Sequence, residues 1–189
     1  MEAGISLPRK RFTRDEVDQL LELGIFSGQR YELIDGALID TMGQSPRHAY
    51  SICRFQEWLF GMFGAGAVRI QAPVEAAGQD AQSSLPEPDL AVLAGENREY
   101  HLRHPRGNEL LLSVEVSDSF AAFDLGRKAT LYAHAGVPEY WVLDLVQRRL
   151  VSYRRPDGAE YQHIRIHSED EMVSTEGRAE AVRVGDLLP

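Results

Sequence analysis

The 189-residue sequence lacks the features that mark a secreted or membrane-bound protein. It has one cysteine, Cys53, so no internal disulfide can form, which suits a reducing compartment. No apolar run approaches the roughly 20 residues that span a bilayer, and the first residues form no apolar signal segment. We therefore expect a cytoplasmic protein with no membrane partner, and a buried structural thiol at Cys53, which lies in a helical pattern.

Positive charge is also scarce. The formal net charge is −9, from 29 acidic and 20 basic residues, which argues against nonspecific attraction to phosphate polymers. Residues 157–189 contain eight acids and three arginines, a net of −5, so over half of the imbalance is C-terminal. Basic residues cluster at 9–11, 98–106 and 148–155. Each cluster is either a contact for a phosphate backbone or a solvated loop or strand edge.

The length and composition suit one globular domain over residues 1–189. A capping box, Thr13 to Glu16, begins a helix, and an Asp35-Gly36 turn predicts a tight β-hairpin. Caps, turns and apolar spacing together predict an α/β domain with a mixed sheet. We expect helices over 13–24, 47–63 and 123–135, a hairpin over 31–40, and strands over 67–74, 87–93, 109–116, 139–145, 148–155 and 159–166, with one more within 179–188.

Two acidic residues stand out because they lie in or beside apolar strands. Asp89 is near the start of the strand 87–93, and Glu115 is near the end of the strand 109–116. A buried carboxylate is costly unless it is paired, hydrogen-bonded or bound to a cation. If the two strands are neighbours in the sheet, the acids meet and can hold Mg²⁺, which takes one or two protein carboxylates and keeps several waters.

A lysine can complete this group. Asp124, Lys128 and Tyr132 recur at every fourth residue of the third helix, which directly follows Glu115 and can pack back over the sheet. A lysine beside two carboxylates keeps its proton, because opposite charges favour the charged form. The residues leave a simpler interpretation open, in which Asp89, Glu115 and Lys128 form a buried ion-paired group without a catalytic role.

These residues carry a resemblance to a known family. The segments "PEPDLAVL", "SVEVSDS" and "DLGRKATLYAHAGVPEYWVLD" resemble the PD-(D/E)XK nuclease superfamily, specifically its restriction-endonuclease-like group once described as a domain of unknown function. The segments "YELIDGALI" and "SPRHAYSI" fit the same group. The resemblance covers about residues 31–154. It implies a restriction-endonuclease-like core, a mixed β-sheet flanked by helices, with additional hairpins, an N-terminal helix and an acidic C-terminal β extension.

The sequence departs from the superfamily pattern at one position. Ser117 stands two residues after Glu115, where the superfamily's tripeptide places a lysine. The resemblance implies that Lys128, 11 residues further along the chain, takes over that role.

The resemblance implies a Mg²⁺- or Mn²⁺-dependent endonuclease that hydrolyses phosphodiester bonds of nucleic acid, with DNA as the expected substrate and a homodimer as the usual form of a duplex cutter. Asp89, Glu115 and the backbone carbonyl of Val116 would hold the metal. Glu32 is a candidate further ligand and can equally be a surface residue of the hairpin. The resemblance also makes His48 a candidate contact for the phosphate, whereas an isolated histidine is more often a partly exposed structural residue. The alternative is a noncatalytic nuclease-like fold that acts as a binding or regulatory module.

Overall fold

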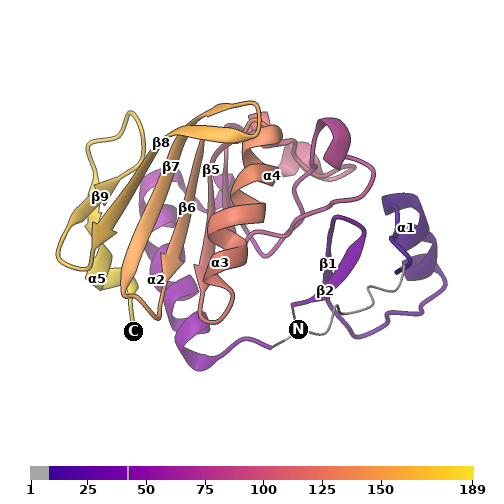
Figure 1. Cartoon of the computed structure of the whole chain (residues 1–189). Helices are drawn as coiled ribbons and strands as arrows, with labels where there is room; N and C mark the ends of the chain where they lie inside the picture. The colour runs from indigo at the N-terminus through magenta and orange to yellow at the C-terminus, as the bar shows by residue number, and fades with distance from the viewer. Residues whose placement is uncertain (1–8, 42) are drawn as a thin grey trace, which may run out of the picture.

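The computed structural model describes residues 9–41 and 43–189. A six-stranded sheet lies at its centre (Figure 1), in the order β3-β4-β5-β6-β7-β8. Strands β5 and β6 are parallel, and the other neighbouring pairs are antiparallel. The strands are β3 (Val68–Ile70), β4 (Leu90–Leu93), β5 (Leu110–Ser117), β6 (Glu139–Asp144), β7 (Arg149–Asp157) and β8 (Glu160–Ser168). The predicted mixed sheet is confirmed.

The parallel pair β5 and β6 needs a crossover connection, and the third predicted helix provides it. This helix has three parts: α3 (Ala121–Phe123), the π-helical turn η5 (Asp124–Lys128) and α4 (Ala129–His134). Its position agrees with the prediction, but the π turn was not expected. Such turns are rare and occur often at functional sites, and this one ends at Lys128.

Alternating side chains along the strands divide the core into two layers. On one face, α2 (Pro46–Phe63) buries the predicted row Ile52, Phe55 and Leu59 against the sheet. Val114 and Val116 of β5 belong to this layer. Residue Glu115 between them faces the opposite layer, which α4 covers together with a group of tyrosines, Tyr132, Tyr140, Tyr153 and Tyr161.

The N-terminal elements lie beside the end of the sheet near α3 (Figure 1). Helix α1 (Arg14–Glu22) begins with the predicted capping box at Thr13. The predicted hairpin consists of β1 (Tyr31–Ile34) and β2 (Ala37–Asp40), paired antiparallel. Asp35 and Gly36 at its turn both have positive φ, 52° and 74°, as a tight two-residue turn requires.

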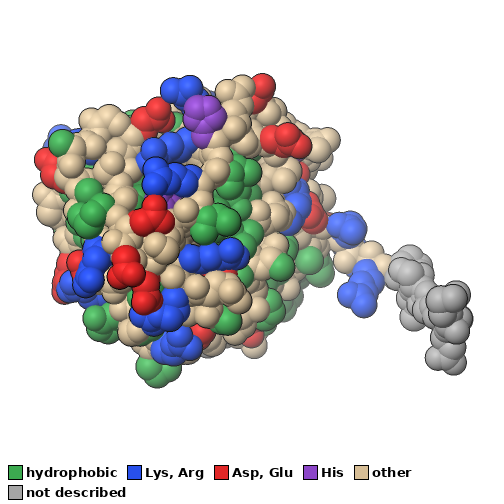
Figure 2. All heavy atoms as spheres, turned by 60° about the vertical axis from the view of Figure 1, so that its left-hand side comes forward, with side chains coloured by type: hydrophobic (Ala, Val, Ile, Leu, Met, Phe, Trp, Pro, Cys, Tyr) green, Lys and Arg blue, Asp and Glu red, His purple; other side chains and the backbone are tan. Residues whose placement is uncertain are grey.

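The acidic C-terminal segment is partly balanced by its own arginines. It forms a two-stranded sheet of β9 (Met172–Ser174) and β10 (Ala181–Arg183) and then α5 (Val184–Leu187), so the strand predicted within 179–188 ends early. Exposed ion pairs join acids of this segment to arginines, as in Arg165–Glu171 and Arg183–Asp186. Figure 2 shows acidic and basic side chains interspersed on this side of the molecule. The segment therefore presents no surface of a single charge.

The prediction of a buried thiol at Cys53 is wrong. Cys53 is exposed on α2, because the core-facing row of that helix runs through Ile52, Phe55 and Leu59 and residue 53 projects away from it. In the part of the chain that the structure describes, no helix is long and apolar enough to cross a membrane.

Candidate active site

Asp89, which directly precedes β4 because that strand begins at Leu90 rather than at the predicted residue 87, meets Glu115 of the neighbouring β5. Strands β4 and β5 are adjacent, as predicted, and their antiparallel register pairs Leu90 with Val114, so that Asp89 and Glu115 stand opposite each other one step further on. The backbone N–H of Val116 donates to Oδ2 of Asp89 at 2.9 Å. This bond fixes the Asp89 carboxylate beside the end of β5. Both side chains are buried, with Asp89 8% and Glu115 5% exposed.

Lys128 reaches Glu115 from the π turn above the sheet. Its amine lies 2.9 Å from Oε1 of Glu115 and 3.0 Å from Oε2 of Glu32 in the hairpin. The side chain of Asp124, at the other end of the turn, is 4.0 Å away. Glu32 is thus a buried member of the cluster rather than a surface residue of the hairpin.

Tyr132 is a site residue to which the sequence argument gave no role. Its hydroxyl donates to Oε1 of Glu115 at 2.9 Å, the oxygen that also binds Lys128. The helical spacing of Asp124, Lys128 and Tyr132 was the available signal, since it placed all three on one face. The spacing could not show which of them touch Glu115.

Burial dominates the electrostatics of this cluster. It raises the pKa of Glu32 and Asp124, and it raises the pKa of Glu115 well above its ordinary value, although the charge of Lys128 acts in the opposite direction. Burial alone would lower the pKa of Lys128, but the surrounding carboxylates outweigh it and raise that pKa. Lys128 therefore stays protonated. Three carboxylates, those of Glu32, Glu115 and Asp124, lie within 4.0 Å of this one ammonium, an excess of negative charge that protons or a cation can neutralise.

His48 contacts Asp89 rather than standing apart from the site. It lies in the first turn of α2, and its Nε2 is 3.1 Å from Oδ2 of Asp89. Burial lowers the pKa of His48, but its hydrogen bond with Asp89 and the charge of that residue outweigh burial, so the pKa is raised. A protonated His48 would offset part of the excess negative charge. A contact of His48 with a phosphate stays a prediction.

Gln71 is a second residue that the sequence did not reveal. Its side-chain amide donates to Oδ1 of Asp89 at 3.3 Å, and its backbone N–H donates to the Asp89 carbonyl at 2.9 Å. Its φ is +47°, in the left-handed region that non-glycine residues seldom adopt. Arg30 holds this conformation by donating to the side-chain and backbone oxygens of Gln71, each at 3.2 Å. Backbone strain of this kind often occurs at functional sites.

A neighbouring ion-pair network attaches the hairpin to the helix that carries Lys128. Arg127 donates two hydrogen bonds to Asp35, at 2.6 and 2.7 Å, and a third to Asp80 at 2.6 Å. Asp80 also binds Nδ1 of His134 at 2.7 Å. Bidentate arginine–carboxylate pairs fix geometry as well as charge. This network therefore fixes the position of the hairpin, which carries Glu32, relative to the helix that carries Lys128.

The donor atoms of the cluster fit a hard cation such as Mg²⁺, because they are oxygens. Within residues 9–41 and 43–189, no group of three or more His, Cys, Asp and Glu side chains is arranged to hold a metal ion. Lys128 and Tyr132 both donate to Oε1 of Glu115, which leaves Oε2 without a donor from the described residues. The cluster therefore fits an ion that Asp89 and Glu115 hold and that keeps several waters, and it does not fit a closed protein cage.

Comparisons with known proteins agree with this fold. The crystal structure described as "a putative nuclease belonging to DUF820" from Anabaena variabilis is similar, with a TM-score of 0.71 over 93% of this chain and 97% of that chain, at 15% sequence identity. This likeness confirms the restriction-endonuclease-like fold. No curated protein matches the chain. The model of the family described as "Putative restriction endonuclease" matches residues 15–182. The chain therefore belongs to this family, Uma2, which confirms the resemblance to restriction-endonuclease-like proteins.

Proposed function

We propose that this protein is a metal-dependent nuclease that hydrolyses phosphodiester bonds of DNA. The observation that supports this proposal most is that Asp89, directly before β4, meets Glu115 on the neighbouring β5, with the amine of Lys128 2.9 Å from Glu115. Burying so many ionisable groups is costly to folding, and packing does not require it. Groups of perturbed ionisable residues of this kind gather at functional sites.

Each residue of the cluster has a role in this proposal. Asp89, Glu115 and the backbone carbonyl of Val116 would hold Mg²⁺ or Mn²⁺. When bound, such an ion lowers the pKa of a coordinated water and neutralises charge that develops on the phosphate. The protonated amine of Lys128 supplies a fixed positive charge and N–H donors, which suit it to orient a water molecule or a phosphate oxygen. The Tyr132 hydroxyl holds Glu115 in place.

Glu32 and His48 act in this proposal as positioning residues. Glu32 binds Lys128 at 3.0 Å and accepts a hydrogen bond from the backbone N–H of Glu87 at 3.3 Å, and so holds the amine at the cluster. His48 binds Asp89 at 3.1 Å and limits the rotation of that carboxylate. Neither residue needs to contact the substrate for these roles.

DNA is the proposed substrate because the family description names restriction endonucleases, which act on duplex DNA. One site of this kind cuts one strand. Cutting both strands of a duplex would need two sites of opposite orientation, which a two-fold symmetric homodimer supplies. A homodimer is therefore part of this proposal.

A second candidate function is a noncatalytic nuclease-like module that binds nucleic acid or a regulatory partner. The observation that favours it is the pairing of Lys128 with both Glu115 and Glu32. These ion pairs engage groups that the catalytic proposal needs for metal and substrate. The two candidates differ in one property, because only the nuclease has to bind a divalent cation through Asp89 and Glu115.

Cleavage assays on the full chain test the proposal. Purified protein is incubated with Mg²⁺ or Mn²⁺ and a panel of single- and double-stranded DNA and RNA, and products are resolved on denaturing gels. We expect cleavage of DNA that chelator abolishes. Asp89→Asn and Glu115→Gln should each remove the activity, whereas Glu57→Gln, the same chemical change at an exposed position of α2, should keep it.

The outcomes separate the two candidates. Cleavage that persists in Asp89→Asn and Glu115→Gln would mean that the activity comes from elsewhere, either another site or a contaminant. No cleavage of any substrate by the wild type, combined with nucleic-acid binding that needs no metal, would favour the noncatalytic module. Cleavage of RNA alone would keep the nuclease and correct its substrate.

A further inference from the structure

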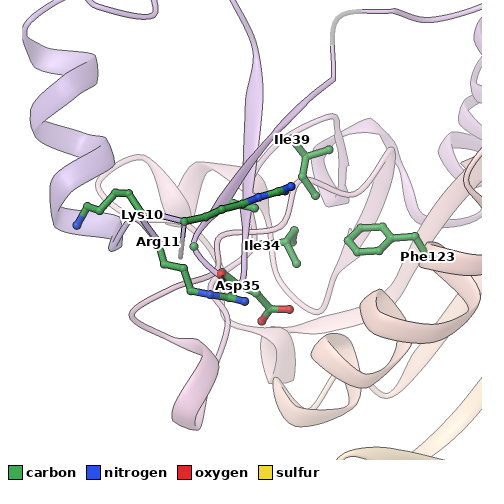
Figure 3. Close-up of a pocket in the computed structure, with 9 residues that line it drawn as sticks. Lys10, Arg11, Ile34, Asp35, Ile39 and Phe123 are labelled. Atoms are coloured by element: carbon green, nitrogen blue, oxygen red, sulfur yellow. Dashed lines mark hydrogen bonds between the residues drawn. The ribbon is translucent and has the colours of Figure 1, made fainter. Parts of the chain in front are cut away.

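A cavity of about 330 Å³ lies between the N-terminal segment, the hairpin and α3. Its apolar side is formed by Ile34, Ile39 and Phe123, and Figure 3 shows the Phe123 ring reaching from the helix towards the two isoleucines. Its other side is formed by the basic run Arg9, Lys10 and Arg11. The cavity thus combines a flat aromatic surface with a cationic rim.

The rim is held in place by contacts between the N-terminal segment and the hairpin turn. The backbone N–H of Phe12 donates to the carbonyl of Gly36 at 2.9 Å, and the guanidinium of Arg11 donates to the carbonyl of Asp35 at 2.6 Å. A Cβ on Gly36 would lie 2.7 Å from Cβ of Arg11, so only glycine permits this close approach. The N-terminal segment is therefore held against the hairpin turn, and the cavity between them is a fixed part of the fold.

The charge around the cavity suits an anion. Lys10 is paired with Glu16 at 2.6 Å, so its charge is neutralised and does not add to the positive charge of the rim. The carboxylate of Asp35 is neutralised by Arg127. Arg9 is exposed, and no described residue pairs with it. Arg9 and Arg11 together leave a net positive rim beside the aromatic ring.

The cavity adjoins the carboxylate cluster. Ile34 follows Glu32 by two residues on β1, so both point to the same side of the strand. Phe123 directly precedes Asp124, which belongs to the cluster. The strand and the helix that carry cluster residues therefore also form the apolar side of the cavity.

We propose that this cavity holds one unpaired nucleotide of the nucleic-acid substrate, with its base against Phe123 and its phosphate on Arg9 and Arg11. The identity of the ligand rests on the proposed nuclease function. The volume is at the lower end of ligand pockets, about 300–1,000 Å³, which suits a single base and excludes a base pair with its backbones. Stacking on an aromatic ring beside arginines is how proteins bind bases of single strands. The substrate class is therefore DNA with an unpaired or extruded nucleotide next to the cut.

Binding measured without metal tests this proposal. Fluorescence anisotropy of a labelled single-stranded DNA of about 12 nucleotides, within the usual site size, is recorded in chelator so that no cleavage occurs. We expect Phe123→Leu, which keeps an apolar side chain, to weaken binding at least about fivefold, the lower end for loss of one base stack. Arg9→Glu should weaken binding and reduce the slope of log K against log salt by about 0.7, one phosphate contact on a single strand.

Matched variants and a modified ligand make the test specific. Phe63→Leu, in the opposite core layer, and Arg183→Glu, near α5, should bind as the wild type does. An oligonucleotide with one abasic position should show the same loss as Phe123→Leu, and the two losses should not add. Equal binding by the wild type and Phe123→Leu would overturn the proposal. A loss in Arg9→Glu without any effect of Phe123→Leu or of abasic positions would also overturn it, because the site would then read phosphate alone.

The failure of this proposal can be told apart from failure of the nuclease function. If metal-dependent cleavage is intact and Phe123→Leu leaves both binding and KM unchanged, the nuclease stands and the nucleotide cavity does not. If no substrate is cut but the base-dependent binding is seen, the cavity stands and the protein binds nucleic acid without hydrolysing it.

Discussion

The amine of Lys128 lies 2.9 Å from Oε1 of Glu115, although the two residues are 13 positions apart and on different elements. Ser117 occupies the strand position where the superfamily's tripeptide has its lysine, and the helix delivers an ammonium to Glu115 instead. The π turn brings this about, since its extra residue shifts Lys128 around the helix relative to an α-helical continuation. The amine of Lys128 is held by two carboxylates, Glu115 and Glu32.

We expect Mn²⁺ to raise the melting temperature of the wild type, because a cation that binds only the folded state stabilises it by mass action. Glu115→Ala should lose this gain, since it removes one of the two carboxylates proposed to bind the ion. Differential scanning calorimetry with and without Mn²⁺ measures the shift. Glu57→Gln, at an exposed site, is the control and should keep it. A shift of the same size in Glu115→Ala would remove that residue from the proposed ligands.

Lys128→Ala should destabilise the metal-free protein by about 3–5 kcal/mol, the usual cost of removing one partner from a buried ion pair. Glu32, Glu115 and Asp124 would then lack their cation. Mg²⁺ should restore part of the stability, and its affinity should stay equal or increase because a competing positive charge is gone. Hydrolysis should fall on the order of 10²-fold or more. Urea denaturation with and without Mg²⁺, beside the cleavage assay, checks these outcomes. An equally active variant would exclude the proposed role of the amine.

The sequence was sufficient for the parts of the site that depend on strand order. Asp89 and Glu115 could be placed together because both lie in strong apolar strand patterns that follow each other along the chain. The contacts of Gln71 and Tyr132 could not be predicted, since they depend on a positive φ and on the exact rotation of a helix. Burial of Glu32 depends on how the hairpin packs against α4, a long-range relation that a local pattern does not contain. The single-domain organisation stays a prediction.

The stability of the metal-free protein should decrease as pH rises. Glu32, Glu115 and Asp124 have raised pKa values in the folded state, so folding retains protons that the unfolded chain releases near the ordinary glutamate value of 4.5. The contribution of these three carboxyl groups to the free energy of unfolding is complete below that pH and is lost as pH rises through their folded-state pKa values. Urea denaturation in chelator from pH 4.5 to about pH 8 measures it. In Glu115→Gln the free energy of unfolding should decrease less with pH. If the free energy of unfolding of the wild type increases over this range, the carboxylates do not carry the proposed excess of negative charge.

Arg127 should control how firmly the hairpin is held. Arg127→Lys keeps the charge but cannot reproduce the bidentate pair with Asp35 together with the bond to Asp80. We expect faster hydrogen exchange at the amides of β1 and β2, and a loss of about 1–3 kcal/mol in stability, the scale of hydrogen bonds to charged groups. Arg98→Lys, at an exposed arginine, is the control. Unchanged amide hydrogen exchange in the hairpin would show that Arg127 does not fix the hairpin, and with it Glu32, relative to Lys128.

A lysine placed at position 117 should replace the one at position 128. Ser117 is buried two residues after Glu115, on the same face of β5. In the double variant Ser117→Lys/Lys128→Ala, the space left by the helix side chain can receive the new amine, and the carboxylates regain their cation. We expect most of the metal-free stability to return and hydrolysis to recover about tenfold from the single variant, a part of the effect of one positioned charge. Ser117→Met/Lys128→Ala, with similar length and no charge, is the control. If the methionine variant recovers equally, filled space rather than positive charge is what the cluster requires.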